Sequence, residues 1–136
     1  MVMTLQLPAM IFEELVHHAK RESPNESVGM LIGKDGLVFE YLPLINELQS
    51  PTRFLTEARS MLQAEKRRRQ LGCDVLAIVH SHPTSEPIPS QYDVADHYSN
   101  DVMCVIVSLM QAEPHLRSWW IVNGEVLEAR WEMITK

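Results

Sequence analysis

The chain is 136 residues long, which predicts one domain, because two domains would each be too small to bury a core. Hydrophobic residues make up 46% and charged residues 22%, as in ordinary globular proteins, so a disordered or fibrous chain is excluded. Eighteen acidic against twelve basic residues give a formal charge of −6, which argues against binding nucleic acids without base specificity, because that needs positive charge facing the phosphates.

The cysteine content and the apolar runs of the sequence indicate in which cellular compartment the protein is expected. The two cysteines, Cys73 and Cys104, are too few and too irregular for a disulfide framework. No apolar run reaches the length of a bilayer-spanning helix. The first twelve residues carry no Lys or Arg and are interrupted by Gln6 and Pro8, unlike a signal peptide. These features predict a cytoplasmic protein with neither a membrane nor a nucleic-acid partner.

The first half of the chain predicts two helices around a hairpin. A helix is expected from about Pro8 to Glu22, because apolar residues recur at helical spacing and Pro suits a first helical position. A second helix is expected from a cap at Thr56 to Leu71, with Gly72 as its stop. Between them, short apolar runs predict a hairpin and one further strand, at residues 27–32, 37–42 and 53–55.

The second half predicts strands around one short helix. The run Val75–Val79 is typical of a buried strand, Ser90–Asn100 of a short helix, and Val102–Leu109 of another strand. Asn123-Gly124 predicts the tight turn of a final hairpin, whose strands are residues 116–122 and 125–131. The resulting order, αββαβαβββ, predicts an α/β (α+β) fold with a central mixed sheet flanked by helices.

The residues that indicate chemistry follow the run at 75–79. His80 and His82 lie two apart, so at the end of a strand both imidazoles point to the same side. Pro83 ends the strand there, and Asp93 lies in the first turn of the next predicted helix, where a short loop can bring it to the same point. Two His and one carboxylate are a catalytic zinc set that leaves the fourth position to water.

An amide hydrolase with such a metal also needs a general base. Several carboxylates are available, and spacing alone does not choose between them. Glu26 is one attractive candidate because it opens a predicted apolar strand, where a carboxylate is otherwise unfavourable.

Taken together, these segments resemble the JAMM metalloprotease family, also called JAB or MPN+, in its small prokaryotic form. The family pattern is an upstream Glu, then His-x-His-Pro, then Ser-x-x-Asp. The chain has PNESVGMLIG at 24–33, HSHP at 80–83 and SQYD at 90–93, with ten residues between His82 and Asp93. The predicted element order is also similar to the family fold, which implies a JAB/MPN, cytidine-deaminase-like architecture in one domain, residues 1–136.

The resemblance implies a role for each residue of the pattern. His80, His82 and Asp93 would bind Zn²⁺, Glu26 would be the general acid/base that activates water, and Ser90 would hydrogen-bond the oxyanion. Family members cleave amide or isopeptide bonds after the C-terminal tail of ubiquitin or ubiquitin-like proteins, and small prokaryotic members act on ubiquitin-like sulfur carriers or modifiers.

Two departures from the family pattern affect the expected substrate. Ser27 stands where Cys is common, at a position that is not a ligand. The spacing around Asp93 leaves no room for the inserted segments that hold ubiquitin in eukaryotic members. A compact site for a small ubiquitin-like partner or another peptide-like substrate is therefore expected, with the tail extended beside a sheet edge.

Each candidate also has an ordinary structural interpretation. Ser90 and Asp93 form a helix-capping pair, the two His could be satisfied polar residues at a strand end, and Glu26 could be an exposed acid beside a turn. His97 lies one helical turn after Asp93 and could be a partner of the ligands, although a surface His is the simpler interpretation.

The remaining His, Cys, Trp and basic residues are interpreted as structural. His17, His18 and His115 have no partners at ligand spacing, and the two Cys are expected to be buried and inert. At least one of the adjacent Trp119 and Trp120 is expected to point away from the core. The basic run 66–69 is interpreted as a solvated helix end.

Three functions follow from these observations. The first is a zinc-dependent peptidase or isopeptidase that cleaves after the tail of a ubiquitin-like or sulfur-carrier protein. The second is a non-catalytic scaffold of the same fold. The third is a hydrolase with the same metal site and another substrate, for example one linked to DNA repair. The substrate protein, the group released, the oligomeric state and a native metal other than zinc stay open.

Overall fold

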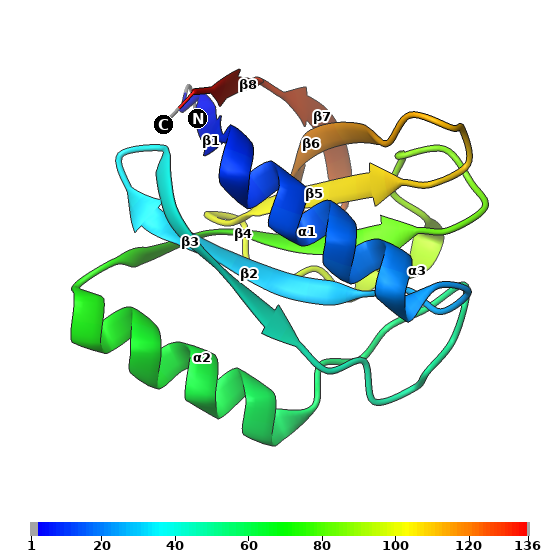
Figure 1. Ribbon diagram of the computed structural model, residues 1–136, viewed down its shortest axis with the longest axis horizontal. Helices are drawn as coiled ribbons and strands as arrows, with labels where there is room; N and C mark the ends of the chain where they lie inside the picture. The colour runs from blue at the N-terminus through cyan, green and yellow to red at the C-terminus, as the bar shows by residue number, and fades with distance from the viewer. Residues whose placement is uncertain (1–2, 136) are drawn as a thin grey trace.

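The computed structural model describes residues 3–135 (Figure 1). Its helices are α1 (Ala9–Glu22), α2 (Ala58–Leu71) and α3 (Gln91–Ala95). Its strands are β1 (Leu5–Pro8), β2 (Val28–Lys34), β3 (Leu37–Leu44), β4 (Asp74–His82), β5 (Met103–Ser108), β6 (His115–Val122), β7 (Glu125–Ala129) and β8 (Trp131–Ile134). The expected α/β class with helices flanking a mixed sheet is confirmed.

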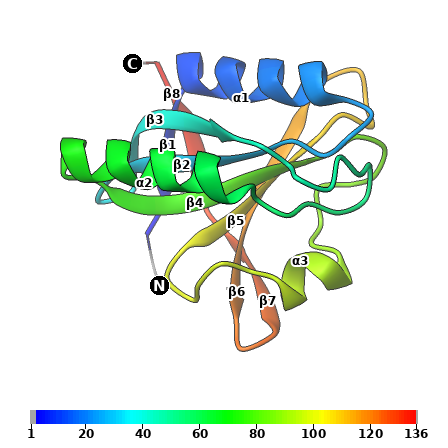
Figure 2. The same ribbon diagram turned by 90° about the horizontal axis from the view of Figure 1, so that it is seen from below.

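The strands form one eight-stranded sheet in the order β7-β6-β5-β4-β2-β3-β1-β8. β4 lies in its interior, antiparallel to β2 and parallel to β5. The sheet is strongly twisted, and the β6–β7 hairpin extends beyond its body (Figure 2). The two edges of the sheet are therefore β7 and β8, neither of which neighbours β4.

Helices cover both faces of the sheet. The apolar stripe of α1, including Ile11 and Leu15, packs with Leu31 of β2 and Val79 of β4. The alternate side chains of the same strands face the other way, where Met30 of β2 lies in a cluster with residues of α2. Val94 of α3 packs on that second face, against side chains of β5 and β6. Because β4 is covered on both faces, its apolar run is explained, and the polar residues at its end are buried as well.

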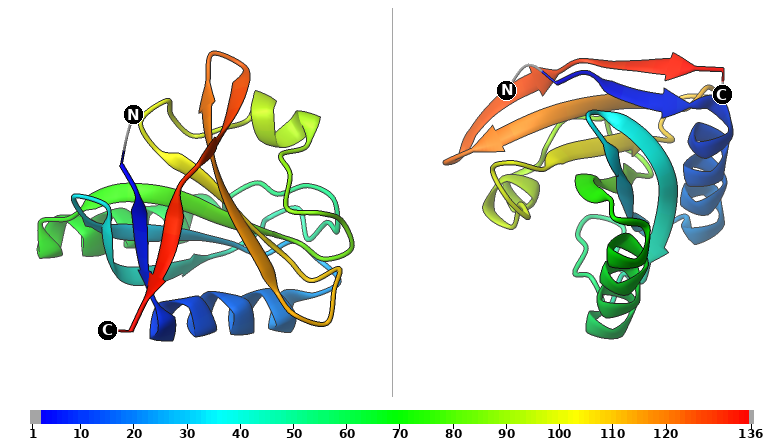
Figure 3. Two further views of the ribbon diagram at one scale, coloured as in Figure 1. Left: turned by 90° about the horizontal axis from the view of Figure 1, so that it is seen from above. Right: turned by 90° about the vertical axis from the view of Figure 1, so that its left-hand side faces the viewer.

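The strands at the two ends of the chain were not predicted. β1 pairs in parallel with β8, and the two lie side by side in Figure 3. Helix α1 starts after β1, with Pro8 as the residue before its first turn. The predicted last strand is interrupted at Arg130, and the part that follows becomes β8. Four-residue strands that pair across the whole chain leave no local periodicity to detect.

Other boundaries also differ from the expectation. No strand forms at 53–55; Asn46 and Thr56 make an isolated bridge instead. The cap of α2 is Glu57, whose side chain accepts a hydrogen bond from Ser60 N, and α3 is much shorter than the predicted 90–100. The run predicted at 75–79 extends through His82, so both His are part of β4 itself.

Trp119 and Trp120 differ from the expectation, because both are buried. They point to opposite faces, and each face is covered by its own cluster.

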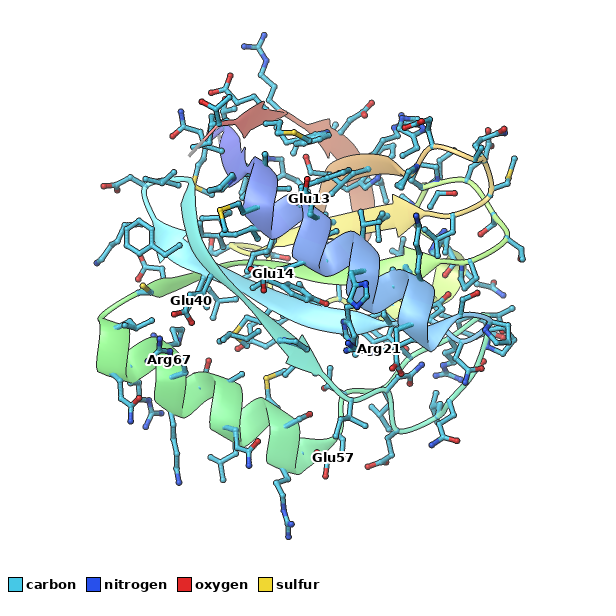
Figure 4. All side chains as sticks on the ribbon, in the orientation of Figure 1. Glu13, Glu14, Arg21, Glu40, Glu57 and Arg67 are labelled. Carbon is cyan, nitrogen blue, oxygen red and sulfur yellow. The ribbon has the colours of Figure 1, made fainter. Side chains whose placement is uncertain are left out.

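Two of the four basic residues in the run 66–69 form ion pairs at the surface. Arg67 meets Glu40 of β3, as Figure 4 shows, and Arg68 pairs with Glu65 one turn earlier in α2. Such exposed pairs contribute little to stability. No helix within residues 3–135 combines the length and the apolar character that crossing a bilayer would require.

Candidate metal centre

The last residues of β4 place two imidazoles on the face shared with α2 and α3. Val28 of β2 is opposite His80, and β5 pairs with β4 through His82, so the strand is fixed on both sides. His80 and His82 are both buried and point to the same side, as their spacing predicts. Ser81 points to the opposite side, where its Oγ accepts a hydrogen bond from Ser27 N.

Helix α3 brings the carboxylate to this point. Ser90 and Asp93 form a complete capping box: Ser90 Oγ accepts from Asp93 N at 3.1 Å, and Asp93 Oδ2 accepts from Ser90 N at 2.9 Å. The capping interpretation is therefore confirmed. It does not compete with ligation, because the cap fixes Asp93 in the rotamer that faces the two His.

Three donor atoms meet in a tight triangle. His80 Nε2 is 3.0 Å and His82 Nε2 is 3.1 Å from Asp93 Oδ2, and the two Nε2 atoms are 3.2 Å apart. Ligands bound tetrahedrally at about 2.0–2.1 Å lie about 3.3–3.4 Å from one another, so a small outward movement would accommodate an ion. Within residues 3–135 this is the group of His, Cys and acidic side chains arranged to hold a metal.

The neighbours of the His side chains favour metal binding. His82 Nδ1 donates to the carbonyl of Glu86 at 2.7 Å, so Nε2, the atom in the triangle, is the ring nitrogen that can bind a metal once it has lost its proton. Phe54 packs on His80 with ring centroids 4.7 Å apart, so this imidazole is held by an apolar contact.

The charges of the triangle follow from burial and contact. Burial lowers the pKa of His80, which keeps it in the neutral form that binds metals. Burial alone would raise the pKa of Asp93, but its hydrogen bonds with His80 and His82 outweigh this and hold it well below its usual range. For His82, burial is outweighed by the hydrogen bond to Asp93, so its pKa is raised. An anionic carboxylate beside imidazoles is a suitable site for a divalent cation.

Glu26 is buried beside this group, with only 3% of its surface exposed, so the interpretation as an exposed acid is wrong. Its Oε1 has no hydrogen-bond partner among the described residues. Burial raises the pKa of Glu26 to about 8, and the nearby His82 and Asp93 shift it further in opposite directions. A buried carboxyl without a partner is unfavourable in the protein alone, and a cation or a polar substrate nearby would relieve this cost.

Two hollows share lining residues on the side of α2 and α3, and one of them adjoins the triangle. A cavity of about 80 Å³ includes His80, Asp93, Met61 and Cys104 in its lining. It shares residues with a groove of about 470 Å³, lined by Leu48, Arg53, Phe54, Leu55, Thr56 and Asp96. β4 has a paired strand on each side, so the strand that carries the two His offers no free edge of its own for strand addition.

His97 does not join the triangle. Its Nε2 donates to the carbonyl of Val102 at 2.7 Å, and its ring lines the cavity. His18, interpreted from the sequence as structural or exposed, is buried and hydrogen-bonded to the Tyr41 hydroxyl. The sequence did not indicate Asn46 or Phe54, which touch Glu26 and His80 from the loop after β3. Isolated Asn and Phe residues in a loop carry no spacing signal.

The fold and the triangle define a class of protein domain. Its mixed sheet has an interior strand that ends in His-x-His, and an Asp from a capped helix completes the group of three side chains. The chain belongs to the Prok-JAB family, the prokaryotic homologs of the JAB domain, whose match covers residues 8–122. The resemblance inferred from the motifs is thereby confirmed.

Two relatives have named activities. The chain is 32% identical over 130 residues to the CysO-cysteine peptidase of Mycobacterium tuberculosis, covering 93% of this chain and 89% of the relative. It is 36% identical over 95 residues to the probable TtuB-protein conjugate cleaving protease of Thermus thermophilus, covering 69% and 64% of the two chains.

Solved structures have the same architecture. A solution structure of a Desulfitobacterium hafniense protein matches with a TM-score of 0.90 at 31% identity, covering 98% of this chain and 94% of the other. A crystal structure of a JAB1/MPN domain protein from Archaeoglobus fulgidus matches with a TM-score of 0.61 at 18% identity, covering 95% and 98%, which supports the fold alone.

Proposed function

We propose that this chain is a zinc-dependent peptidase or isopeptidase that hydrolyses the amide bond after the C-terminal tail of a ubiquitin-like or sulfur-carrier protein. The observation that carries the proposal is the buried triangle of His80, His82 and Asp93 with an unpartnered carboxyl, Glu26, beside it. The named activities of the two relatives support the substrate class.

The three triangle residues would hold the zinc ion through His80 Nε2, His82 Nε2 and Asp93 Oδ2. A zinc ion with three protein ligands lowers the pKa of water to about 7 and polarises a carbonyl group. Two imidazole nitrogens and one carboxylate oxygen are a ligand set that catalytic zinc sites use.

Glu26 and Ser90 would carry out the proton transfer and the charge stabilisation. Glu26 takes the proton of the attacking water and gives it to the leaving amine, which requires a carboxyl that exchanges protons near neutral pH. Its raised pKa, about 8 in the protein alone, falls towards neutrality when positive charge is placed nearby. Ser90 uses an oxygen lone pair for the helix cap, so its O–H is available to donate to the developing oxyanion.

The groove between the loop at 48–56 and α3 would receive the substrate tail. It is lined by both apolar and polar groups and continues into the cavity against His80 and Asp93. A flexible, extended tail fits such a groove, whereas a folded protein does not. The free, buried Cys73 and Cys104 support placing this protein in a reducing cytoplasm.

The test combines metal content with cleavage. Wild type, His82→Ala, Glu26→Gln and the control His17→Ala, an exposed His on α1, are purified with zinc and analysed for metal. The substrate is a ubiquitin-like sulfur carrier ending in Gly-Gly and extended by one amino acid, and cleavage is read by intact mass.

We expect about one zinc per chain in the wild type and in His17→Ala, and a sharp loss in His82→Ala. Glu26→Gln should keep the zinc and lose turnover by about 100-fold or more. A wild type that binds zinc but cleaves no carrier would favour a metal hydrolase with another substrate. A wild type that binds no zinc at neutral pH would favour a non-catalytic scaffold.

A further inference from the structure

Asn46 is a buried amide whose full hydrogen-bonding capacity is used. Its Nδ2 donates to the carbonyls of Glu26 at 3.0 Å and of Arg53 at 3.1 Å. Its Oδ1 accepts from Leu48 N and from Leu55 N, both at 3.1 Å. An amide has two N–H donors and two acceptor lone pairs, so every position is occupied. Asn46 therefore closes the loop between β3 and α2 and attaches it to Glu26.

The position of Glu26 depends on this loop. β2 starts at Val28, so the backbone of Glu26 lies outside the sheet ladder. Its N–H donates to the carbonyl of Ser50 at 2.8 Å, and its C=O accepts from Asn46. Both backbone groups of Glu26 are thus bonded to the loop, and its carboxyl Oε1 has no bond of its own among the described residues.

The same loop reaches the metal centre by a second route. Phe54 follows Arg53, whose carbonyl Asn46 holds, and packs on the His80 ring. Phe54 also lines both the cavity and the groove. The Asn46 side chain is therefore connected to the backbone of Glu26 and, through Arg53, to Phe54. Phe54 in turn lines the groove and packs on His80.

We propose that Asn46 is a positioning residue that fixes the carboxyl of Glu26 relative to His80, His82 and Asp93. The proposal rests on the proposed function, in which Glu26 transfers the proton. It goes beyond that function by assigning the placement of the general base to an amide from a different loop. A catalytic group held about 1 Å out of place can lose about 100-fold in rate.

Asn46→Asp keeps half of the hydrogen bonds that close the loop. The substitution keeps the acceptors for Leu48 N and Leu55 N and removes both donors, so the carbonyls of Glu26 and Arg53 are released. Asn46→Ser is the second variant, because its smaller side chain leaves room for water at the loop amides. The matched control is Ser60→Ala in α2. It removes the hydrogen bond that Ser60 Oγ accepts from Ile45 N of the same loop, and it does not touch Glu26.

Two measurements are made on the zinc-loaded proteins. The first is kcat and KM on the extended carrier protein, together with zinc content. The second is amide hydrogen exchange by NMR at Glu26 and at Leu55, which needs no substrate. In Asn46→Asp we expect kcat to fall by about 10- to 100-fold, KM to change by less than about threefold and zinc content to stay unchanged.

In the exchange experiment the Glu26 amide should lose protection by about 10-fold in Asn46→Asp while the Leu55 amide keeps it. Ser60→Ala should stay within about twofold of the wild type in kcat. Unchanged kcat in both Asn46 variants would overturn the proposal, and so would an equal loss in Ser60→Ala. If the wild type cleaves no carrier, the proposed function fails by itself, and unchanged protection of Glu26 in Asn46→Asp would still overturn the positioning role.

Discussion

Glu26 gives the sharpest prediction for the metal-free protein, because its burial has a cost that depends on pH. Its pKa of about 8 in the fold, against an ordinary value of 4.5, means that the fold favours the protonated form. A group of this kind contributes its stability below the ordinary value and loses it as the pH rises through the folded value. Glu26→Gln cannot ionise and should therefore gain stability over the wild type as the pH rises from 4.5 to 8.

The magnitude follows from the shift. Each pKa unit corresponds to about 1.4 kcal/mol, so the cost of ionising Glu26 approaches about 5 kcal/mol above pH 8 at the most. Solvent in the adjoining groove screens part of this cost. The free energy of unfolding of Glu26→Gln minus that of the wild type should therefore rise by about 2–3 kcal/mol between pH 5 and pH 8. A buried amide without partners adds an offset of about 1–3 kcal/mol that does not vary with pH. The slope with pH is therefore the quantity to measure.

The assay is urea unfolding of the wild type and Glu26→Gln at several pH values between 5 and 9, in chelator. Glu13→Gln, which changes an exposed carboxyl on α1, is the control and should follow the wild type at every pH (Figure 4). A difference between Glu26→Gln and the wild type that stays constant from pH 5 to 9 would refute the reasoning. Adding zinc should flatten the slope, because a nearby cation favours the ionised carboxylate.

Two further substitutions test the cap and the packing. Ser90→Asp keeps an acceptor at the helix cap but has no hydroxyl to donate. The free energy of unfolding in urea should therefore change by less than about 1 kcal/mol, while kcat falls about 10- to 100-fold. Equal activity would exclude Ser90 from charge stabilisation. Gly29→Ala places a methyl group against the ring and hydroxyl of Tyr41, which is buried and held by His18, so unfolding should show a loss of about 1–3 kcal/mol. A neutral result for Gly29→Ala would show that Tyr41 can move aside.

The triangle could be predicted from the sequence because its signals are local. His80 and His82 share a side through the two-residue period of a strand, and Asp93 lies in the first turn of a short helix whose cap is visible in the residue types. The capped helix fixes one rotamer, so a spacing in sequence becomes a distance in space. Glu26 was selected mainly through the family resemblance, and the structure adds a physical reason, its burial beside the triangle.

The parts that could not be predicted depend on contacts between distant segments. β1 and β8 stabilise each other from opposite ends of the chain, and neither run carries enough periodicity to be recognised alone. Asn46 is one amide in a loop of irregular structure, and its four hydrogen bonds exist only once β2, β3 and the loop have come together. Residues that hold a functional group in place are in general harder to find from sequence than the group itself.

The helix cap and the metal centre are a single arrangement. Asp93 Oδ2 accepts from Ser90 N and faces both imidazoles with the same atom, so the cap that starts α3 also aims the ligand. Ser90 closes the other half of the cap with an oxygen lone pair, so the cap does not use its O–H. A carboxylate placed in this way is ordered before any metal arrives, which lowers the entropy lost on binding. The capping pair and the proposed ligand set are therefore compatible, because the same Asp93 atom takes part in both.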